Sequence, residues 1–179
     1  MFARLDALFA AQGGRATWIA QLQSSFDRWE ALTGIDFTRV SAAGVEHDDG
    51  AWGADASATR GHIRIGMRNI DGAWNALVHT FPPNNGDIVL DLSEAWASAA
   101  DDYRFIRNVV MHEVGHSVGL PHVCSSDSNQ LMAPILDTSI DGPRQDDIRA
   151  MQRLYGDDFE PDNATAAATS VQLTMGVPT

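Results

Sequence analysis

HEVGHSVGLPH, residues 112–122, contains three of the six histidines of this 179-residue chain within eleven positions. His112 and His116 are four residues apart, so on a helix their side chains project from one face, with β-carbons about 5–6 Å apart. Both imidazoles can then reach one metal ion. Glu113 is rotated by about 100° around the helix, where it can reach a water molecule on that ion as a general base.

The residues after His116 predict a turn that brings a third imidazole to the same ion. Gly119 lies three residues beyond His116, where a glycine in the left-handed conformation would end the helix and reverse the chain. Pro121 then restricts the backbone ahead of His122. Three histidine ligands leave the fourth tetrahedral position to water, which is typical of a catalytic zinc site and not of a closed structural one.

Composition and length predict a single folded domain without nucleic-acid or membrane partners. Hydrophobic residues make up 44% of the chain and charged residues 20%, which is ordinary for a globular protein. The formal net charge of −12 disfavours binding to phosphate backbones or anionic lipid. Cys124 is the single cysteine, so a zinc site must use histidine and carboxylate ligands, and no disulfide can form within the chain.

The N-terminal residues do not predict a targeting segment. Arg4 and Asp6 interrupt the apolar residues of MFARLDALFAAQGG, so this stretch is neither a signal peptide nor a membrane span. The sequence therefore predicts either a cytosolic protein or one whose leader has been removed.

Apolar periodicity predicts an α+β fold with a small sheet. A helix with one apolar stripe is expected over 17–32, a second over 102–119 with Asp101 and Asp102 at its start, and a third from Asp146 to Gly156. Alternation and β-branched content predict strands at 35–40, 62–67, 76–81 and 87–92.

The motif at 112–122, followed by LMAP at 131–134, resembles the metzincin signature of zinc endopeptidases, H-E-x-x-H-x-x-G-x-x-H with a Met-turn. DGPRQDDIRAMQRLYG at 141–156 narrows the resemblance to matrixins, whose closing helix it is similar to. The resemblance covers roughly 17–156 and implies a zincin-like catalytic domain with a small twisted mixed sheet, an active-site helix and a C-terminal helix.

The resemblance implies further roles around the metal. Met132 would form a hydrophobic floor beneath the three histidines, although a methionine in this setting also fits an ordinary core position. The acids Asp146 and Asp147 would anchor the Met-turn and the mature N-terminus; acids in the first turn of a helix also suit its dipole without any other role.

The resemblance also implies where a peptide substrate binds. The backbone of Leu77 and Val78 would pair with an extended peptide along an exposed strand edge. The side-chain pocket beyond the zinc would be formed by the segment after the Met-turn, here Pro134, Ile135 and Leu136.

The same resemblance bears on metal sites other than the catalytic zinc. Asp91 and Glu94 match acids that bind structural calcium in the family, with solvated surface charge as the alternative. Animal matrixins hold a second, structural zinc; His79 matches one of its ligands, but Val89 replaces another. No second zinc is therefore predicted, and His47 and His62 are given no partners. Cys124 is expected to be a structural or free thiol and not a latency switch.

The same resemblance implies the limits of the domain and the location of the protein. We expect residues 1–160 to form the matrixin-like catalytic domain and 161–179 to be a linker or the start of a C-terminal accessory domain. The shortened form is more similar to bacterial matrixin-like proteases than to animal ones, and the resemblance implies a secreted, monomeric protein.

The predicted function is a zinc-dependent endopeptidase, in which Glu113 assists attack of a zinc-bound water on a peptide carbonyl of a protein or peptide substrate. Two alternatives stay open. One is a zinc-containing binding module without turnover, which would have a blocked or shallow cleft. The other is a zinc hydrolase of a non-peptide bond, which would require the strand edge beside the zinc to be covered.

Overall fold

The computed structural model describes residues 1–40, 61–123 and 129–157 and has the predicted α+β architecture. Helix α1 is followed by a short 3-10 helix, helix α2, the three strands, and helices α3 and α4. Their bounds are α1 Phe2–Leu8, the 3-10 helix Ala10–Gln12, α2 Arg15–Glu30, β1 Ile65–Arg68, β2 Val78–Thr80, β3 Ile88–Asp91, α3 Arg104–Ser117 and α4 Gln145–Tyr155. None of these helices is long and apolar enough to cross a membrane.

The sheet is mixed, and β2 lies at its edge. The strand order is β1-β3-β2, with β3 parallel to β1 and antiparallel to β2. All four residues of the central strand β3 are buried, in accord with the apolar run of its first three residues, 88–90. Among the described residues, β2 pairs with β3 alone, so its other side keeps backbone groups available for an added strand.

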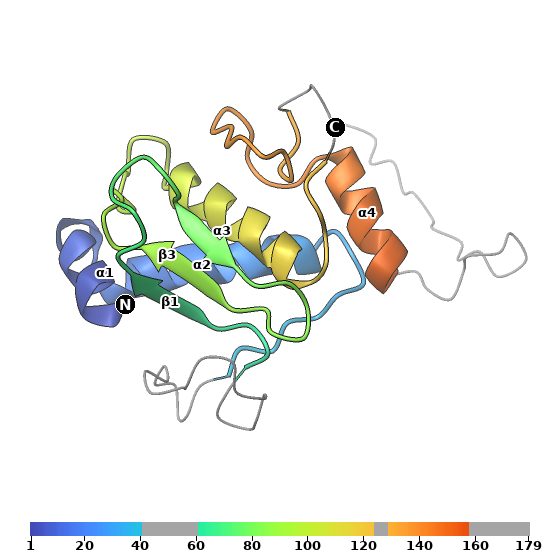
Figure 1. Cartoon of the computed structure of the whole chain (residues 1–179), viewed down its shortest axis with the longest axis horizontal. Coiled ribbons are helices and arrows are strands. Elements are labelled where there is room, and N and C mark those ends of the chain that lie inside the picture. The colour runs from blue at the N-terminus through green and yellow to red at the C-terminus, as the bar shows by residue number, and fades with distance from the viewer. Residues whose placement is uncertain (41–60, 124–128, 158–179) are drawn as a thin grey trace, which may run out of the picture.

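Helices α2 and α3 pack side by side, and α3 also contacts β2 and β3 (Figure 1). The indole of Trp29 donates a hydrogen bond of 2.9 Å to the carbonyl of Met111, and the hydroxyl of Ser25 donates one of 3.3 Å to Arg107. Both bonds attach α2 to the middle of α3. The largest fully buried side chains are Trp18, Trp29, Trp96, Phe9, Leu5, Ile88, Leu90, Ile106, Met111, Met132, Ile140 and Met151.

Several predicted elements are confirmed, but the strand at 35–40 is wrong. These residues form no strand, because the backbone N–H of Phe37 donates to the carboxylate of Glu30 and its ring packs on Phe26 at 5.1 Å. A strand needs a backbone partner, whatever its side-chain pattern. Helix α3 begins at Arg104 and not at Asp102, since Asp102 and Tyr103 have positive φ angles.

The segment before α4 is attached to that helix through one buried carboxylate. Asp147 accepts hydrogen bonds from the backbone N–H groups of Leu131 at 2.8 Å, Met132 at 3.1 Å and Arg144 at 2.8 Å. The implied anchoring of the Met-turn by Asp147 is therefore present. Asp146 is exposed, and its implied contact with the mature N-terminus stays a prediction.

Replacing Asp147 by Asn should lower the free energy of unfolding by about 2–4 kcal/mol, because a buried acceptor of three N–H groups becomes partly a donor. Urea unfolding of the zinc-loaded protein measures this change. Asp146→Asn is the matched control and should shift stability by less than about 0.5 kcal/mol, as for other exposed positions. Equal effects of the two variants would contradict the anchoring role of Asp147.

Candidate metal centre

The turn after α3 directs the third histidine toward the first two. The N–H of Leu120 donates to the carbonyl of Gly115 at 2.8 Å, and the N–H of Gly119 donates to His116 at 3.0 Å. This is the Schellman pair of hydrogen bonds, and it requires the left-handed φ of +105° found at Gly119. The predicted helix end is confirmed, and the chain returns past Pro121 to His122.

His112, His116 and His122 converge in a geometry that fits one zinc ion. One ring nitrogen from each lies within 4.8 Å of the others. The Nε2 atoms of His112 and His122 are 3.2 Å apart, close to the roughly 3.3 Å that separates two nitrogen ligands on a tetrahedral zinc.

Backbone carbonyls fix the orientation of the two helical histidines. Nδ1 of His112 lies 2.6 Å from the carbonyl oxygen of Leu131, and Nδ1 of His116 lies 2.7 Å from that of Leu120. Each Nδ1–H donates to its carbonyl, so each Nε2 keeps its lone pair for a metal. Burial, followed by the neighbouring histidines, lowers the pKa of His112 to about 4, which keeps the ring in the neutral, metal-binding form.

Glu113 is a buried carboxyl on the adjoining face of α3. Burial raises the pKa of Glu113 to about 7, and the hydroxyl of Thr80 and the field of His79 oppose only part of this rise. Both opposing groups come from β2, so the carboxyl lies between the active-site helix and the edge strand. A carboxyl with this pKa can both accept and release a proton near neutral pH.

Met132 lies directly beneath the histidine-bearing face of α3. An added β-carbon at Gly115 would come within 2.6 Å of the Met132 sulfur and 3.1 Å of its methyl carbon. The thioether is therefore packed against the bare backbone between His112 and His116. Gly115 was not among the predicted site residues; its place inside a helix, where glycine is unfavourable, was the available signal.

Comparison with known proteins agrees with this geometry. The family model described as Matrixin matches residues 10–156. This chain belongs to the matrixin family. Membership assigns the matched region to the metalloendopeptidases and confirms the resemblance inferred from residues 112–156.

Individual matrixins show the same similarity. The chain is 33% identical over 156 residues to matrix metalloproteinase-18 of Xenopus laevis, covering 83% of this chain and 31% of that protein. It is 35% identical over 144 residues to interstitial collagenase of Bos taurus, covering 78% and 28%. It is 35% identical over 136 residues to metalloendoproteinase 4-MMP of Arabidopsis thaliana, covering 64% and 38%. The chain thus spans about a third of the length of these curated relatives.

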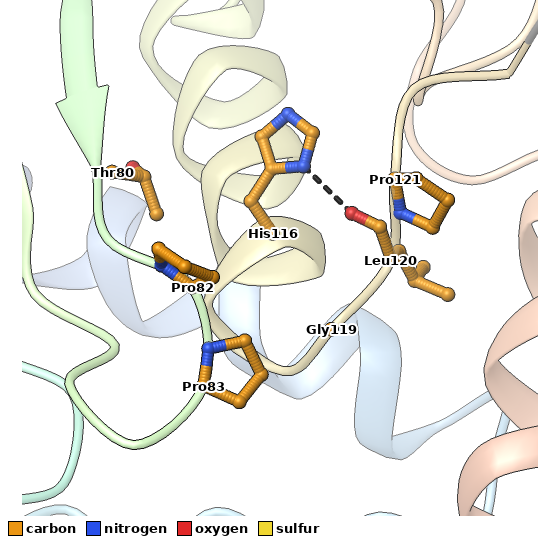
Figure 2. A pocket seen from close by; sticks show the side chains of 7 residues that line it. All are labelled: Thr80, Pro82, Pro83, His116, Gly119, Leu120 and Pro121. Atoms are coloured by element: carbon orange, nitrogen blue, oxygen red, sulfur yellow. Dashed lines mark hydrogen bonds between the residues drawn. The ribbon is translucent and has the colours of Figure 1, made fainter.

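A cavity of about 410 Å³ adjoins the metal centre of this matrixin beside His116 (Figure 2). Its walls come from the end of β2 and from the turn after α3. Figure 2 shows Pro82 and Pro83 on one side and Leu120 and Pro121 on the other. Three proline rings make its walls rigid and free of competing N–H donors.

The residues predicted to form the substrate pocket are at the surface, and their role stays a prediction. Pro134, Ile135 and Leu136 are exposed, with Ile135 exposed to 71%, and they do not line the cavity beside His116. Leu77 and Val78 are half-buried at the free edge of the sheet, where peptide pairing was expected.

The two acids matched to calcium ligands are both buried. Asp91 accepts hydrogen bonds from the N–H groups of Ile70, Asp71 and Ser93 at 2.7–3.1 Å. The Ser93 amide is the largest of the contributions that lower the pKa of Asp91 to about 2. One oxygen of Glu94 accepts the N–H of Trp74 at 2.6 Å, while the other is buried without a partner. The alternative of solvated surface charge is wrong for both residues.

The remaining histidines and the cysteine stand apart from this centre. His79 is exposed on β2, and its cross-strand partner is Val89, the residue expected to replace a second-zinc ligand. His62 is exposed as well. His47 and Cys124 lie outside the described residues, and the absence of a second zinc stays a prediction.

Replacing Gly115 by Ala should destabilise this matrixin by about 1–3 kcal/mol, because the new methyl group overlaps the Met132 side chain. The sign of this stability change is informative, since Gly→Ala in an open helix stabilises a protein by about 0.5–1 kcal/mol. Urea unfolding of a double-mutant cycle with Met132→Ala measures the coupling. An equal cost of Gly115→Ala in both backgrounds would show that Met132 is not the obstacle.

Proposed function

We propose that this chain is the catalytic domain of a zinc-dependent endopeptidase that hydrolyses peptide bonds of protein substrates, with Glu113 as general base. The proposal depends on one observation: the three imidazoles converge beside a buried carboxyl, next to the free edge of a sheet. His112, His116 and His122 would hold the metal. When bound, zinc supplies Lewis-acid activation of water and of the substrate carbonyl.

The residues of the chain divide the remaining tasks between proton transfer and substrate alignment. Glu113 accepts a proton from the attacking water and delivers it to the leaving amine as the carbon–nitrogen bond breaks. The raised pKa of Glu113 suits both directions of transfer. The backbone of Leu77 and Val78 aligns an extended peptide along β2, because strand addition satisfies the N–H and C=O groups of both chains.

The free edge of β2 also favours peptide substrates over other hydrolysable bonds. In the described part of the chain no strand lies against the outer side of β2, and the cavity beside His116 is open to it through Thr80. A binding module without turnover would need neither the buried Glu113 nor the rigid histidine turn. Both features therefore support hydrolysis over simple peptide binding.

We expect the purified, zinc-loaded chain to cleave a denatured protein such as casein, and Glu113→Gln to reduce this rate by about 10²–10⁴-fold, as for loss of a general base. Elemental analysis should give one zinc in both proteins, because Glu113 is not a ligand. His116→Ala, in contrast, should lose zinc and activity together.

The outcomes separate the competing functions. A folded wild type with one zinc that cleaves neither casein nor gelatin would favour the binding module. Cleavage that persists in Glu113→Gln would remove this residue as the base. Hydrolysis of small esters without cleavage of any peptide would favour a non-peptide hydrolase.

Structural calcium at Asp91 and Glu94 is the second part of the proposal. Two buried carboxylates lie three residues apart, and no Lys or Arg of the described residues forms an ion pair with either. The unpartnered oxygen of Glu94 is an acceptor that a cation would satisfy. Carboxylate oxygens are the ligands that calcium prefers.

Terbium, a luminescent calcium substitute, should bind here and be excited by Trp96, whose indole donates to the backbone carbonyl of Asp91 at 2.6 Å. Titration into the zinc-loaded protein should give saturable luminescence that calcium displaces. Glu94→Gln should weaken this signal at least about 10-fold by removing one ligand charge, whereas exposed Asp101→Asn is the control. Equal terbium affinity of both variants would exclude the site.

We further propose that the domain acts outside the cell as a monomer. A net charge of −12 favours a soluble, separate molecule, and calcium sites of modest affinity suit extracellular concentrations. The bacterial character expected from the shortened sequence stays a prediction, because the relatives reported above come from animals and a plant. Light scattering after size-exclusion chromatography measures the mass of the particle.

A further inference from the structure

Trp74 occupies an unfavourable position in two independent respects. Its side chain is 74% exposed, the most of any large hydrophobic residue in the described part of the chain. Its φ angle is +69°, in the left-handed region that bulky residues rarely adopt. An exposed indole and a strained backbone are both unfavourable for the folded state, and backbone strain of this kind is concentrated at ligand-binding sites.

The indole is nevertheless held in place. The backbone N–H of Trp74 donates to Glu94 at 2.6 Å, which fixes the loop before β2. The ring lies 6.5 Å from that of Phe105 on α3, and Phe105 in turn stacks on buried Trp96 at 5.3 Å. Trp74 is therefore the exposed end of a row of three aromatic rings. A rigid, preorganised ring loses little conformational entropy when it binds a partner.

Two contacts place Trp74 on the segment that runs beside α3 toward the three histidines. At one end, Trp74 packs against Phe105, seven residues before His112 on α3, which is about 10 Å along the helix axis. At the other end, Thr80 and His116 line the same cavity. The chain from Trp74 to Thr80 therefore runs beside α3 toward the C-terminal end of that helix. An extended peptide advances about 3.3 Å per residue, so 10 Å corresponds to about three residues.

We propose that Trp74 is a specificity-determining residue, an aromatic platform that contacts a large apolar side chain about three residues from the scissile bond of a peptide paired with β2. This inference rests on the proposed endopeptidase function. An apolar partner is favoured because the indole is exposed beside Phe105 with no acidic side chain on its ring in the described contacts. Burying the two apolar surfaces together would stabilise the bound peptide.

The test compares peptides that differ only at the third residue on either side of the cleaved bond. A cleavage site in casein, mapped by mass spectrometry, supplies the parent peptide, and Leu, Phe, Ser or Lys is placed at each third position. Trp74→Gly is the main variant, because glycine adopts the local φ without strain and should preserve the loop. Trp74→Phe is the conservative variant. Phe81→Ala, an exposed aromatic residue just beyond β2, is the matched control.

Wild type should prefer Leu or Phe at one of the two third positions. Trp74→Gly should raise KM for those peptides by about 5–10-fold with little change in kcat, as expected for loss of one aromatic contact. The KM for Ser peptides should be unaffected by Trp74→Gly. Trp74→Phe should retain most of the preference for Leu or Phe. Phe81→Ala should leave that preference unchanged at the same third position. Zinc content and melting temperature of Trp74→Gly should match those of wild type.

Three results would overturn the inference. The first is identical preference in wild type and Trp74→Gly on both sides of the bond. The second is loss of the same preference in Phe81→Ala. The third is an effect confined to Lys peptides, which would assign the platform to cations and not to apolar side chains. If wild type cleaves no peptide, the proposed function fails, and fluorescence anisotropy with the same labelled peptides still tests Trp74 through binding alone.

Discussion

The candidate metal centre depends on the backbone of Leu131, which links α4 to α3. Its N–H donates to the buried carboxylate of Asp147, and its carbonyl oxygen lies 2.6 Å from Nδ1 of His112. The next residue, Met132, donates to the same carboxylate and packs on Gly115. The carboxylate of Asp147 therefore fixes the position of Met132 beneath the histidines. Through the backbone of Leu131 it also holds the carbonyl that sets the tautomer of His112. A shift of α4 would be transmitted directly to the imidazoles.

The chemistry of the site was predictable because it is encoded by local spacing. The i, i+4 relation of His112 and His116 and the left-handed glycine three residues later leave few positions for His122. The strand at 35–40 and helix α1 were not predictable in the same way. Pairing of 35–40 depends on a neighbouring backbone, and the Phe37 N–H is bonded to Glu30 instead. Helix α1 has only seven residues, too few to be stable without the core cluster in which its Leu5 is buried.

The substrate-contacting residues stay a prediction, since their arrangement depends on loops. The family resemblance implies Pro134–Leu136, and the structure adds a cavity beside His116, formed by Pro82 and Pro83 with the turn at 119–121. Asp91 and Glu94 were singled out by the family resemblance, but their burial and their N–H donors were not predicted, because those donors come from residues 70–74, distant in sequence. Contacts between segments distant in sequence leave no periodic pattern to detect.

The side chains that stabilise the fold and those of the candidate site lie on different sides of α3. Side chains that hold α2 against α3, such as Trp29, are fully buried and hydrogen-bonded. Two features that oppose folding lie where α3 and the segment around β2 meet: the buried carboxyl of Glu113, with its pKa raised to about 7, and the positive φ of Trp74. A rigid core stabilises the whole domain and lets such unfavourable groups persist. Strain alone does not mark a binding site, because Tyr103 also has a positive φ and its ring stacks on Phe9. It is the coincidence of strain with an exposed ring that sets Trp74 apart.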